Sequence, residues 1–356
     1  MIPQIKTDID IKDLNTLRIS ARANYFVAVT ENNQLSEILK LPDYKNLPKL
    51  ILGGGSNILF TKDFPGLVIK IETQGKVVVH EDQQNVYLKV ASGENWHDLV
   101  SYTVDHNWGG IENLALIPGT AGASPVQNIA AYGQNLSDTL ESVEYLDIKQ
   151  NQTKTLTASE CKLSYRDSVF KHELRDRAII TSITIKLRKN PDLETSYYSI
   201  GGRNDSLIAE LEKISQKPYS IKDVFNAVVA IRSRKLLDWK VKPTVGSFFV
   251  NPIVSKKTLA TLQTEISNLQ FYSVDGLEYG NTGNDSTVKI PVGRLLDHLG
   301  WKGKTVGNCM VSEKLASILT HNGKATGKEF LEFVELIKAD VKAKLGVDLQ
   351  TEVNIF

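Results

Sequence analysis

The chain has 356 residues, 41% of them hydrophobic, which is enough for two or three domains with cores of their own. Its 42 basic and 41 acidic residues give a net charge of +1, so charge offers no reason to expect a nucleic-acid partner or an anionic membrane. We find no apolar run of transmembrane length and no apolar core of a signal peptide near the first residues, and we therefore expect a cytoplasmic protein with no membrane partner.

The cysteines and histidines give no sign of a metal site. Cys161 and Cys309 lie far apart in the sequence, and the six histidines are scattered without metal-ligand spacing. We expect reduced thiols in a reducing compartment and no bound metal.

A glycine-rich turn, Gly53-Gly54-Gly55-Ser56-Asn57, stands between two apolar runs at residues 50–52 and 58–60. Glycines let the backbone turn tightly and present bare N–H groups to an anion, and Ser56 and Asn57 add side-chain donors. The residues after the turn are predicted to form a strand, whereas a dinucleotide fingerprint needs a helix there, and no P-loop lysine follows. We predict a diphosphate-holding loop, with an ordinary glycine-rich hairpin as the alternative.

Short strands with partial period-2 alternation are predicted at residues 77–79, 86–90, 143–148 and 179–187. A helix is predicted from Asn95 to Asn107, ending near Gly109-Gly110. Strands and helices do not alternate in a regular βαβ rhythm, and we therefore predict an α+β fold.

A second glycine-rich segment occupies residues 116–133. It holds too many small residues for a core strand and is too apolar for a solvated linker, while Pro118 and Pro125 stiffen its path. Small residues would let a flat ring and a phosphate approach the backbone. An ordinary long loop is the alternative, although long structureless segments are usually functional.

From Ser206 onward the pattern is helical. Ser220 with Asp223 predicts a capped helix ending at about Lys235, and Ser255 predicts a second helix ending at about Leu269. Thr326 and Glu329 predict a capping box for a long final helix that stops at Gly346. Residues 190–205 have the composition of a boundary region.

Several motifs together resemble the UDP-N-acetylenolpyruvoylglucosamine reductases, flavoproteins of peptidoglycan synthesis. They are Asn15-Thr16-Leu17, residues 53–60, 113–133, Tyr165–Lys171 (YRDSVFK), Gly246–Pro252 (GSFFVNP) and Glu352-Val353. The resemblance covers nearly the whole chain. It implies an FAD-binding domain of the PCMH type, made of two α+β subdomains, and a C-terminal α+β substrate-binding domain. We accordingly expect subdomains at 1–73 and 74–222 (the FAD domain proper at about 17–190) and a substrate domain at 223–356, whose last residues return to the active site.

The resemblance also implies the reaction, which is the NADPH-dependent reduction of UDP-N-acetylglucosamine enolpyruvate to UDP-N-acetylmuramate. We expect a monomer with non-covalent FAD. The residues expected to bind FAD lie in the two glycine-rich segments. They are Gly53, Gly54, Gly55, Ser56, Asn57, Pro118, Gly119, Gly122, Ser124, Gln127, Asn128, Ile129, Tyr132 and Gly133.

Three residues match the catalytic positions of the family. Ser247 matches the proton donor, Arg166 can grip and stabilise the substrate carboxylate, and Glu352 can orient the substrate or share in proton transfer. Without the resemblance, Ser247 is a turn residue, Arg166 an ion-pair partner and Glu352 a solvated acid. Substrate contacts are expected from Tyr197, Lys235, Asn251 and Tyr272, with Arg232 and Arg234 as weaker candidates; Tyr197 lies in an inserted segment, Thr195–Gly202, which suggests the subtype with a tyrosine loop.

The chain departs from the family pattern at several positions. Val250 replaces a usual lysine, Ser312 and Leu315 stand where histidine and glutamine are typical, Ala130 replaces a glycine, and one acid remains near the C-terminus where two are common. These changes bear on substrate affinity more than on the flavin fold. Two alternatives stay open: another FAD-dependent oxidoreductase on the same flavin domain, and a catalytically weakened homologue that binds UDP-sugars.

Overall fold

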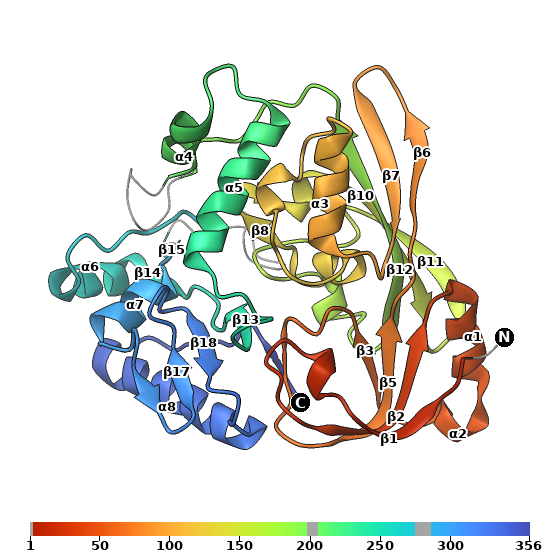
Figure 1. Ribbon diagram of the computed structural model, residues 1–356. Helices are drawn as coiled ribbons and strands as arrows, with labels where there is room; N and C mark the ends of the chain where they lie inside the picture. The colour runs from red at the N-terminus through yellow and green to blue at the C-terminus, as the bar shows by residue number, and fades with distance from the viewer. Residues whose placement is uncertain (1–2, 198–205, 275–285) are drawn as a thin grey trace. The chain divides into compact units, whose positions relative to one another are not determined.

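The computed structural model describes residues 3–197, 206–274 and 286–356, which divide into two compact units (Figure 1). Unit 1 comprises residues 1–9, 23–54 and 65–234, and unit 2 comprises residues 10–22, 55–64 and 235–356. The chain therefore crosses between units inside the first glycine-rich turn, from Gly54 to Gly55. The three functional domains expected from the family resemblance, with boundaries after residues 73 and 222, differ from these two units and remain our proposal.

Unit 1 holds a four-stranded sheet, a five-stranded sheet and a two-stranded pair at residues 130–135. The first has the order β1 (Lys6–Asp10), β2 (Arg22–Val29), β5 (Phe64–Ile71) and β3 (Lys49–Leu52), with β3 parallel to β5. The second is antiparallel throughout, in the order β11 (Gln152–Thr157), β10 (Leu140–Asp147), β12 (Ala178–Arg188), β7 (Asn85–Ala91) and β6 (Lys76–Glu81). Alternation in β7 buries Val86, Leu88 and Val90, as its sequence predicts.

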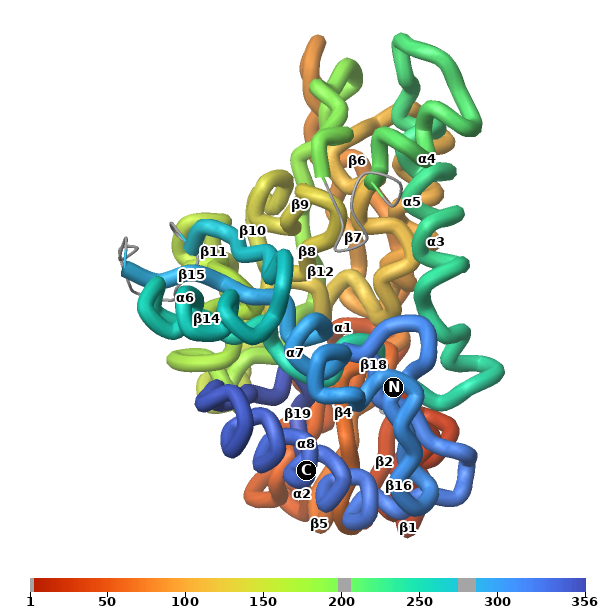
Figure 2. Tube along the Cα trace, turned by 90° about the vertical axis from the view of Figure 1, so that its left-hand side faces the viewer, coloured from red at the N-terminus to blue at the C-terminus, as the bar shows by residue number. Residues whose placement is uncertain are grey.

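The helices of unit 1 are α1 (Asn32–Lys40), α2 (Pro42–Lys45), α3 (Trp96–Asp105), α4 (Leu207–Ile214) and α5 (Ile221–Lys235). Helices α3 and α5 lie beside one another against the antiparallel sheet (Figures 1 and 2) and share its apolar core. Helix α5 has the expected cap, because Ser220 Oγ accepts from the Asp223 N–H at 3.1 Å. Helix α3 is capped in the same way by Asn95, whose Oδ1 accepts from the Asp98 N–H at 3.1 Å. The short elements between β7 and β12 are η2 (Glu112–Leu114), η3 (Ala121–Gln127), β8 (Ala130–Ala131), β9 (Gln134–Asn135), η4 (Leu136–Asp138) and η5 (Val169–Lys171).

Unit 2 contains an antiparallel sheet in the order β13 (Thr244–Ser247), β18 (Ile318–His321), β17 (Cys309–Val311) and β16 (Thr305–Val306). Two further pairs join β14 (Ile253–Ser255) to β15 (Thr287–Lys289) and β4 (Ile58–Leu59) to β19 (Asn354–Ile355). Its helices are η1 (Lys12–Leu14), α6 (Lys256–Glu265), α7 (Val292–His298) and α8 (Gly327–Leu345).

Helix α8 begins and ends where the sequence predicts. Thr326 Oγ1 accepts from the Glu329 N–H at 3.2 Å, and Gly346 closes the helix with a φ of +69°. Helix α6, in contrast, ends at Glu265 and not near Leu269. Ile266 is already extended, and Ile266 and Leu269 enter the core of unit 2 from a non-helical segment.

Mainly antiparallel sheets, without a regular alternation of strand and helix, confirm the α+β prediction. Cys161 and Cys309 are both buried free thiols, and burial raises the pKa of each to about 12.

Candidate active site

In unit 1, the backbones of the two glycine-rich segments pack directly against each other. A Cβ on Gly54 would lie 2.7 Å from the Gly119 Cα, and a Cβ on Gly53 would lie 2.6 Å from the Thr120 Oγ1. Lys70 Nζ, from β5, donates to the Gly53 carbonyl oxygen, and partial burial lowers the pKa of Lys70. The glycines thus bring two loops together beside a cation, a setting that favours an anion.

The second segment is fixed to the rest of unit 1 by its small residues. A Cβ on Gly122 would lie 1.7 Å from the Ser92 Oγ, and the Gly122 N–H donates to the Ser92 carbonyl at 2.9 Å. Ser124 Oγ donates to the Ala121 carbonyl at 2.6 Å, and Asn128 Nδ2 donates to the Ser164 carbonyl at 3.1 Å. The side chains of Ser124 and Asn128 therefore shape this loop, and we propose that their part in cofactor binding is indirect.

The end of the loop holds two residues with left-handed backbones, Tyr132 (φ +49°) and Gly133 (φ +86°). Asn113, which is fully buried, fixes the turn by donating from Nδ2 to the Tyr132 carbonyl at 2.7 Å and to the Glu194 carbonyl at 2.9 Å. The Tyr132 ring meets the Tyr197 ring edge-on, with centroids 5.6 Å apart. From residue 198 onward, the predicted tyrosine loop lies outside the described residues.

Two arginines of unit 1 approach these tyrosines. Arg166 lies in a two-residue turn with a φ of +55°, and its Nη2 donates to the Ala130 carbonyl at 3.3 Å. Arg232, on α5, donates from Nη2 to the Leu116 carbonyl at 3.3 Å, while its Nε is buried with no hydrogen-bond partner. Burial lowers the pKa of Arg232, and the charge of Arg166 acts in the same direction. Burial raises the pKa of Tyr197, which the Arg166 charge opposes.

His97 completes the attachment of Leu116. Its Nδ1 accepts from the Leu116 N–H at 3.2 Å, and its ring stacks on Phe225 of α5 with centroids 5.7 Å apart. Burial lowers the pKa of His97, in keeping with an unprotonated Nδ1. Both backbone groups of Leu116 are thereby held immediately before the Pro118-Gly119 turn.

Arg234, a weaker candidate for anion binding in the sequence, has a different role. Its Nη1 and Nη2 each donate to one oxygen of Glu210 at 2.8 Å, a bidentate pair that joins α5 to α4. Both terminal nitrogens of its guanidinium therefore bind Glu210 within unit 1. Lys235 is the last residue of α5 and lies at the start of unit 2.

In unit 2, Ser247 ends β13 with an exposed side chain, directly after Gly246, whose φ is +77°. Its hydroxyl lies 3.1 Å from the hydroxyl of Ser317, so either oxygen can donate to the other. Phe248 and Phe249 are fully buried and anchor the strand in the core. Glycine at 246 permits the left-handed turn that leaves Ser247 at the surface of unit 2.

The C-terminal segment runs beside this strand. The Glu352 N–H donates to the Phe248 carbonyl at 2.9 Å, and Thr351 forms a bridge with Phe249. Asn57 Nδ2 donates to the Glu352 carbonyl at 3.2 Å. Unit 2 therefore brings together the end of the first glycine-rich turn, the Ser247 strand and Glu352, three parts that are far apart in the sequence.

The Asn15-Thr16-Leu17 motif supports the same region of unit 2. A Cβ on Gly55, whose φ is +64°, would lie 1.9 Å from the Leu14 carbonyl oxygen. The Thr16 N–H donates to the Gly55 carbonyl at 3.0 Å, and the buried Asn15 Nδ2 donates to the carbonyls of Ile11 and Ile19 at 3.0 Å. Gly55 therefore packs directly against the backbone at the start of this motif.

The remaining substrate candidates of unit 2 lie apart from one another along the chain. Asn251 Oδ1 accepts from the Val292 N–H at 2.9 Å, at the start of α7. Tyr272 forms a bridge with Lys289 of β15. Leu315 is partly exposed, and Ser312, three residues earlier, is buried.

Residues 3–197, 206–274 and 286–356 hold no group of three or more His, Cys, Asp or Glu side chains suited to a metal ion. None of the helices in the same ranges has the length and apolar composition that a membrane crossing requires.

Comparison with known proteins places the chain in a family. A family model described as the C-terminal domain of UDP-N-acetylenolpyruvoylglucosamine reductase matches residues 238–356, and one described as an FAD binding domain matches residues 23–156. A protein of Flavobacterium johnsoniae named UDP-N-acetylenolpyruvoylglucosamine reductase is 41% identical over 353 residues, covering 99% of each chain. The chain belongs to the UDP-N-acetylenolpyruvoylglucosamine reductase family. The resemblance identified from its motifs is confirmed.

Other members of the reductase family agree with this assignment. A Chromobacterium violaceum protein of the same name is 38% identical over 353 residues, covering 99% of each chain. The crystal structure of the Thermus caldophilus reductase matches 100% of both chains with a TM-score of 0.68 at 20% identity, a likeness that shows the fold.

The residues of unit 1 fit the FAD of a reductase of this family. The loops meet at Gly54 and Gly119 with no Cβ between them, a close approach of two backbones that glycine allows and that is typical of loops that hold a diphosphate. The buried Arg232 Nε, which has no hydrogen-bond partner, offers a donor that an isoalloxazine carbonyl or ring nitrogen can satisfy. Both features are those of a cofactor cradle.

Sequence reasoning missed or undervalued several residues of this site. Lys70 has the pattern of a strand residue, Asn113 that of a loop residue, and Arg232 that of one among several basic residues at a helix end. Only the tertiary structure shows Lys70 on Gly53, Asn113 on Tyr132 and Arg232 on Leu116. The Val-Ile-Lys-Ile pattern of β5, with a lysine among buried residues, is the one local signal that could have singled out Lys70.

Proposed function

We propose that this chain catalyses the NADPH-dependent reduction of UDP-N-acetylglucosamine enolpyruvate to UDP-N-acetylmuramate in peptidoglycan precursor synthesis. The observation that carries the proposal is the match to named reductases over 99% of the chain, FAD-binding part included. The retained Ser247, Arg166 and Glu352 support it.

The substrate sets the demands on the protein. Its enolpyruvyl group has a C=C bond conjugated to a carboxylate, so a hydride added to the terminal carbon pushes negative charge toward that carboxylate. Bound FAD, reduced by NADPH, supplies the hydride. The protein must stabilise the extra charge and protonate the carbon next to the carboxylate.

Ser247 is our proposed proton donor. A serine hydroxyl is a weak acid, yet the carbanion formed by hydride addition is basic enough to take its proton. Ser317 Oγ, 3.1 Å away, can donate to Ser247 Oγ as that oxygen becomes negative. The buried Phe248 and Phe249 hold the backbone beneath Ser247 in place.

Arg166 is proposed to bind the substrate carboxylate and to stabilise the second negative charge as it develops. A planar guanidinium suits this task because it can contact both carboxylate oxygens and stays protonated. Glu352, whose backbone is hydrogen-bonded to the Ser247 strand at Phe248, is proposed to orient the substrate.

The rest of the substrate carries a diphosphate and a uracil. We propose Tyr197, Lys235, Asn251 and Tyr272 as its contacts, on the basis of the family positions alone. Leu315 lacks the amide of the usual glutamine, so we propose that this chain binds the sugar nucleotide with one polar contact fewer.

We further propose a monomer in the cytoplasm, with no nucleic-acid or membrane partner. The near-neutral net charge of +1 supports this. A single species of about the chain's mass in light scattering after gel filtration is the expected result, and a stable dimer would contradict it.

The function is tested by incubating purified, FAD-loaded protein with NADPH and the enolpyruvyl nucleotide and identifying the product by mass spectrometry. We expect one NADPH to be oxidised for each nucleotide that gains two hydrogens. Flavin-dependent oxygen consumption with no such product would favour another flavin oxidoreductase. Nucleotide binding without turnover would favour a weakened homologue.

A further inference from the structure

The turn that carries Arg166 is strained and needs support. The Ser164 N–H donates to the Asp167 carbonyl at 3.0 Å and the Asp167 N–H donates back at 3.4 Å, which leaves Tyr165 and Arg166 at the tip. Arg166 has a φ of +55°, a left-handed conformation that costs a non-glycine residue on the order of 1–2 kcal/mol. Such a conformation persists where surrounding contacts determine it, often at a functional site.

The first such contact is made by Lys171. Its Nζ donates to the Arg166 carbonyl oxygen at 2.9 Å, and its side chain is partly buried. A charge-assisted hydrogen bond to this oxygen fixes the orientation of the peptide that follows Arg166. Lys171 therefore acts on the backbone of the arginine and not on its guanidinium.

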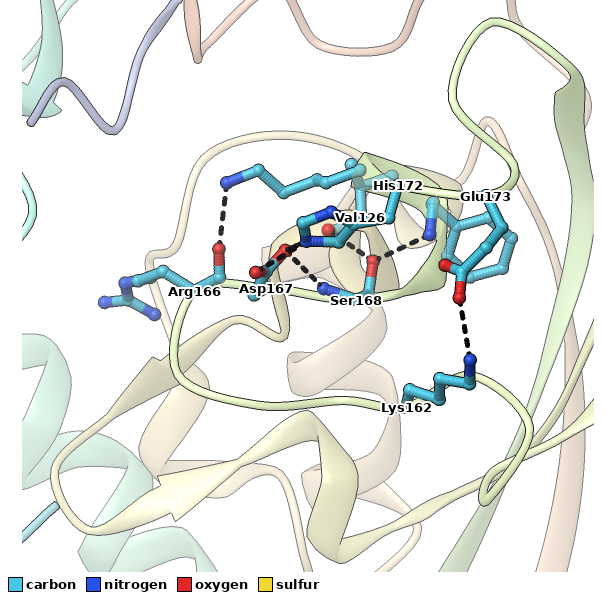
Figure 3. A network of polar contacts seen from close by, with 9 residues as sticks. Val126, Lys162, Arg166, Asp167, Ser168, His172 and Glu173 are labelled. Carbon is cyan, nitrogen blue, oxygen red and sulfur yellow. Dashed lines mark hydrogen bonds and ion pairs between the residues drawn. The ribbon is translucent and has the colours of Figure 1, made fainter. Parts of the chain in front are cut away.

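The second contact is made by Ser168, whose side chain joins the turn to the proposed flavin loop (Figure 3). Its Oγ donates to the Val126 carbonyl of η3 at 2.6 Å and accepts from the Phe170 N–H at 3.2 Å, while its N–H donates to the Asp167 Oδ1 at 2.9 Å. Ser168 is fully buried. Removing its hydroxyl would leave the Val126 carbonyl and the Phe170 N–H without this partner.

One more bond joins the turn to the loop, and another braces the turn against the residue that follows η5. Asn128 Nδ2, from the loop, donates to the Ser164 carbonyl at 3.1 Å, on the other side of the turn. The His172 Nε2 lies 2.8 Å from the Asp167 Oδ2. The Arg166 side chain extends away from this network in Figure 3, so the network holds its backbone and not its charge.

We infer that Ser168 and Lys171 are positioning residues that fix the Arg166 turn on the loop formed by residues 121–133. The backbone from which the Arg166 side chain extends is then fixed before substrate arrives, and it is fixed on the same loop that is proposed to hold the cofactor. This inference rests on the proposed role of Arg166. We expect the consequence only in the step in which Arg166 stabilises charge, because that is the step in which its guanidinium is proposed to act. A group misplaced by about 1 Å can lower the rate of such a step on the order of 100-fold.

The test compares Ser168→Ala and Lys171→Met with the parent as FAD-loaded proteins. Anaerobic stopped-flow measures flavin reduction by NADPH and reoxidation by the enolpyruvyl nucleotide separately. We expect reduction within about twofold of the parental rate and reoxidation slower by about 10- to 100-fold in both variants. Lys171→Arg, which keeps a cationic donor, should recover most of the rate.

A matched control comes from Lys162, in the segment that leads into the Arg166 turn. Lys162 Nζ forms an exposed ion pair with Glu173 at 2.7 Å (Figure 3), and Lys162→Met should leave both half-reactions unchanged. Reoxidation at the parental rate in Ser168→Ala and Lys171→Met, or an equal loss in both half-reactions, would overturn the inference.

Hydrogen exchange gives a readout that does not depend on the proposed reaction. Amides of residues 164–171 should exchange faster in Ser168→Ala and Lys171→Met than in the parent and in Lys162→Met. If the parent protein itself fails to be reoxidised by the nucleotide, the proposed function fails. Unchanged exchange in the two variants would refute the positioning network whatever the reaction.

Discussion

Replacing Gly54 by alanine should weaken FAD binding, because the added methyl group would force apart the two loops that meet there. The new Cβ would lie 2.7 Å from the Gly119 Cα, about 0.7 Å inside the 3.4 Å at which ordinary contacts begin. The obstructing atoms belong to the backbone, so no side-chain rotation can relieve the clash. Overpacking of this kind costs about 1–3 kcal/mol.

If that strain falls on the FAD-bound arrangement of the loops, the dissociation constant of FAD should rise by about 5- to 140-fold. The assay is titration of apoprotein with FAD, followed by quenching of flavin fluorescence. Gly53→Ala should have a smaller effect, since its Cβ would meet the end of the Thr120 side chain, which can rotate.

Gly293→Ala is the matched control. Gly293 lies within α7, and the nearest atom to its new Cβ would be 3.7 Å away. Alanine there fits and favours the helix by up to about 1 kcal/mol. Equal FAD affinity in Gly54→Ala, Gly53→Ala and Gly293→Ala would refute the assignment of this loop contact to the cofactor site. Circular dichroism of Gly54→Ala checks that a loss of affinity is not a loss of folding.

Ser247→Ala should leave flavin reduction by NADPH at the parental rate and slow reoxidation by the enolpyruvyl nucleotide about 10²–10⁴-fold, with part of the rate restored by cysteine; equal loss in both half-reactions would count against it. Leu315→Gln should tighten nucleotide binding by about two- to tenfold in calorimetry, as one added neutral hydrogen bond allows, and an unchanged dissociation constant would reject this. Hydrogen bonds from Arg177 hold the pKa of the buried Asp147 carboxyl well below its usual range, so that carboxylate stabilises the fold above pH of about 4 and loses this effect as the pH falls through its folded-state pKa. The difference in denaturation midpoint between parent and Asp147→Asn should accordingly shrink below pH of about 4, and a difference independent of pH would contradict the assignment.

Local features of the fold were readable from the sequence because their causes are local. The caps at Ser220 and Thr326 are short-range hydrogen bonds, and the stop at Gly346 needs only a left-handed residue. The end of α6 was placed too late because the burial of Ile266 and Leu269 depends on the core of unit 2, which no local pattern reveals.

The candidate site was predictable as a set of segments and not as a set of contacts. Glycines at 53 and 54 indicate that the backbone must come close to something, but the structure shows that this neighbour includes Gly119 of the same unit. Ser124 and Asn128 were expected to bind cofactor, and their side chains hold the loop. The pairing of Arg234 with Glu210 joins residues 24 positions apart, which is beyond the reach of helix periodicity.

The central claim, a flavoprotein that passes hydride from NADPH to an enolpyruvyl nucleotide, is tested most directly by anaerobic stopped-flow spectroscopy of the parent protein. The account predicts that NADPH bleaches the flavin absorbance and that UDP-N-acetylglucosamine enolpyruvate then restores it in the absence of oxygen. A flavin that NADPH does not bleach, or that stays bleached until oxygen is admitted, would contradict the claim.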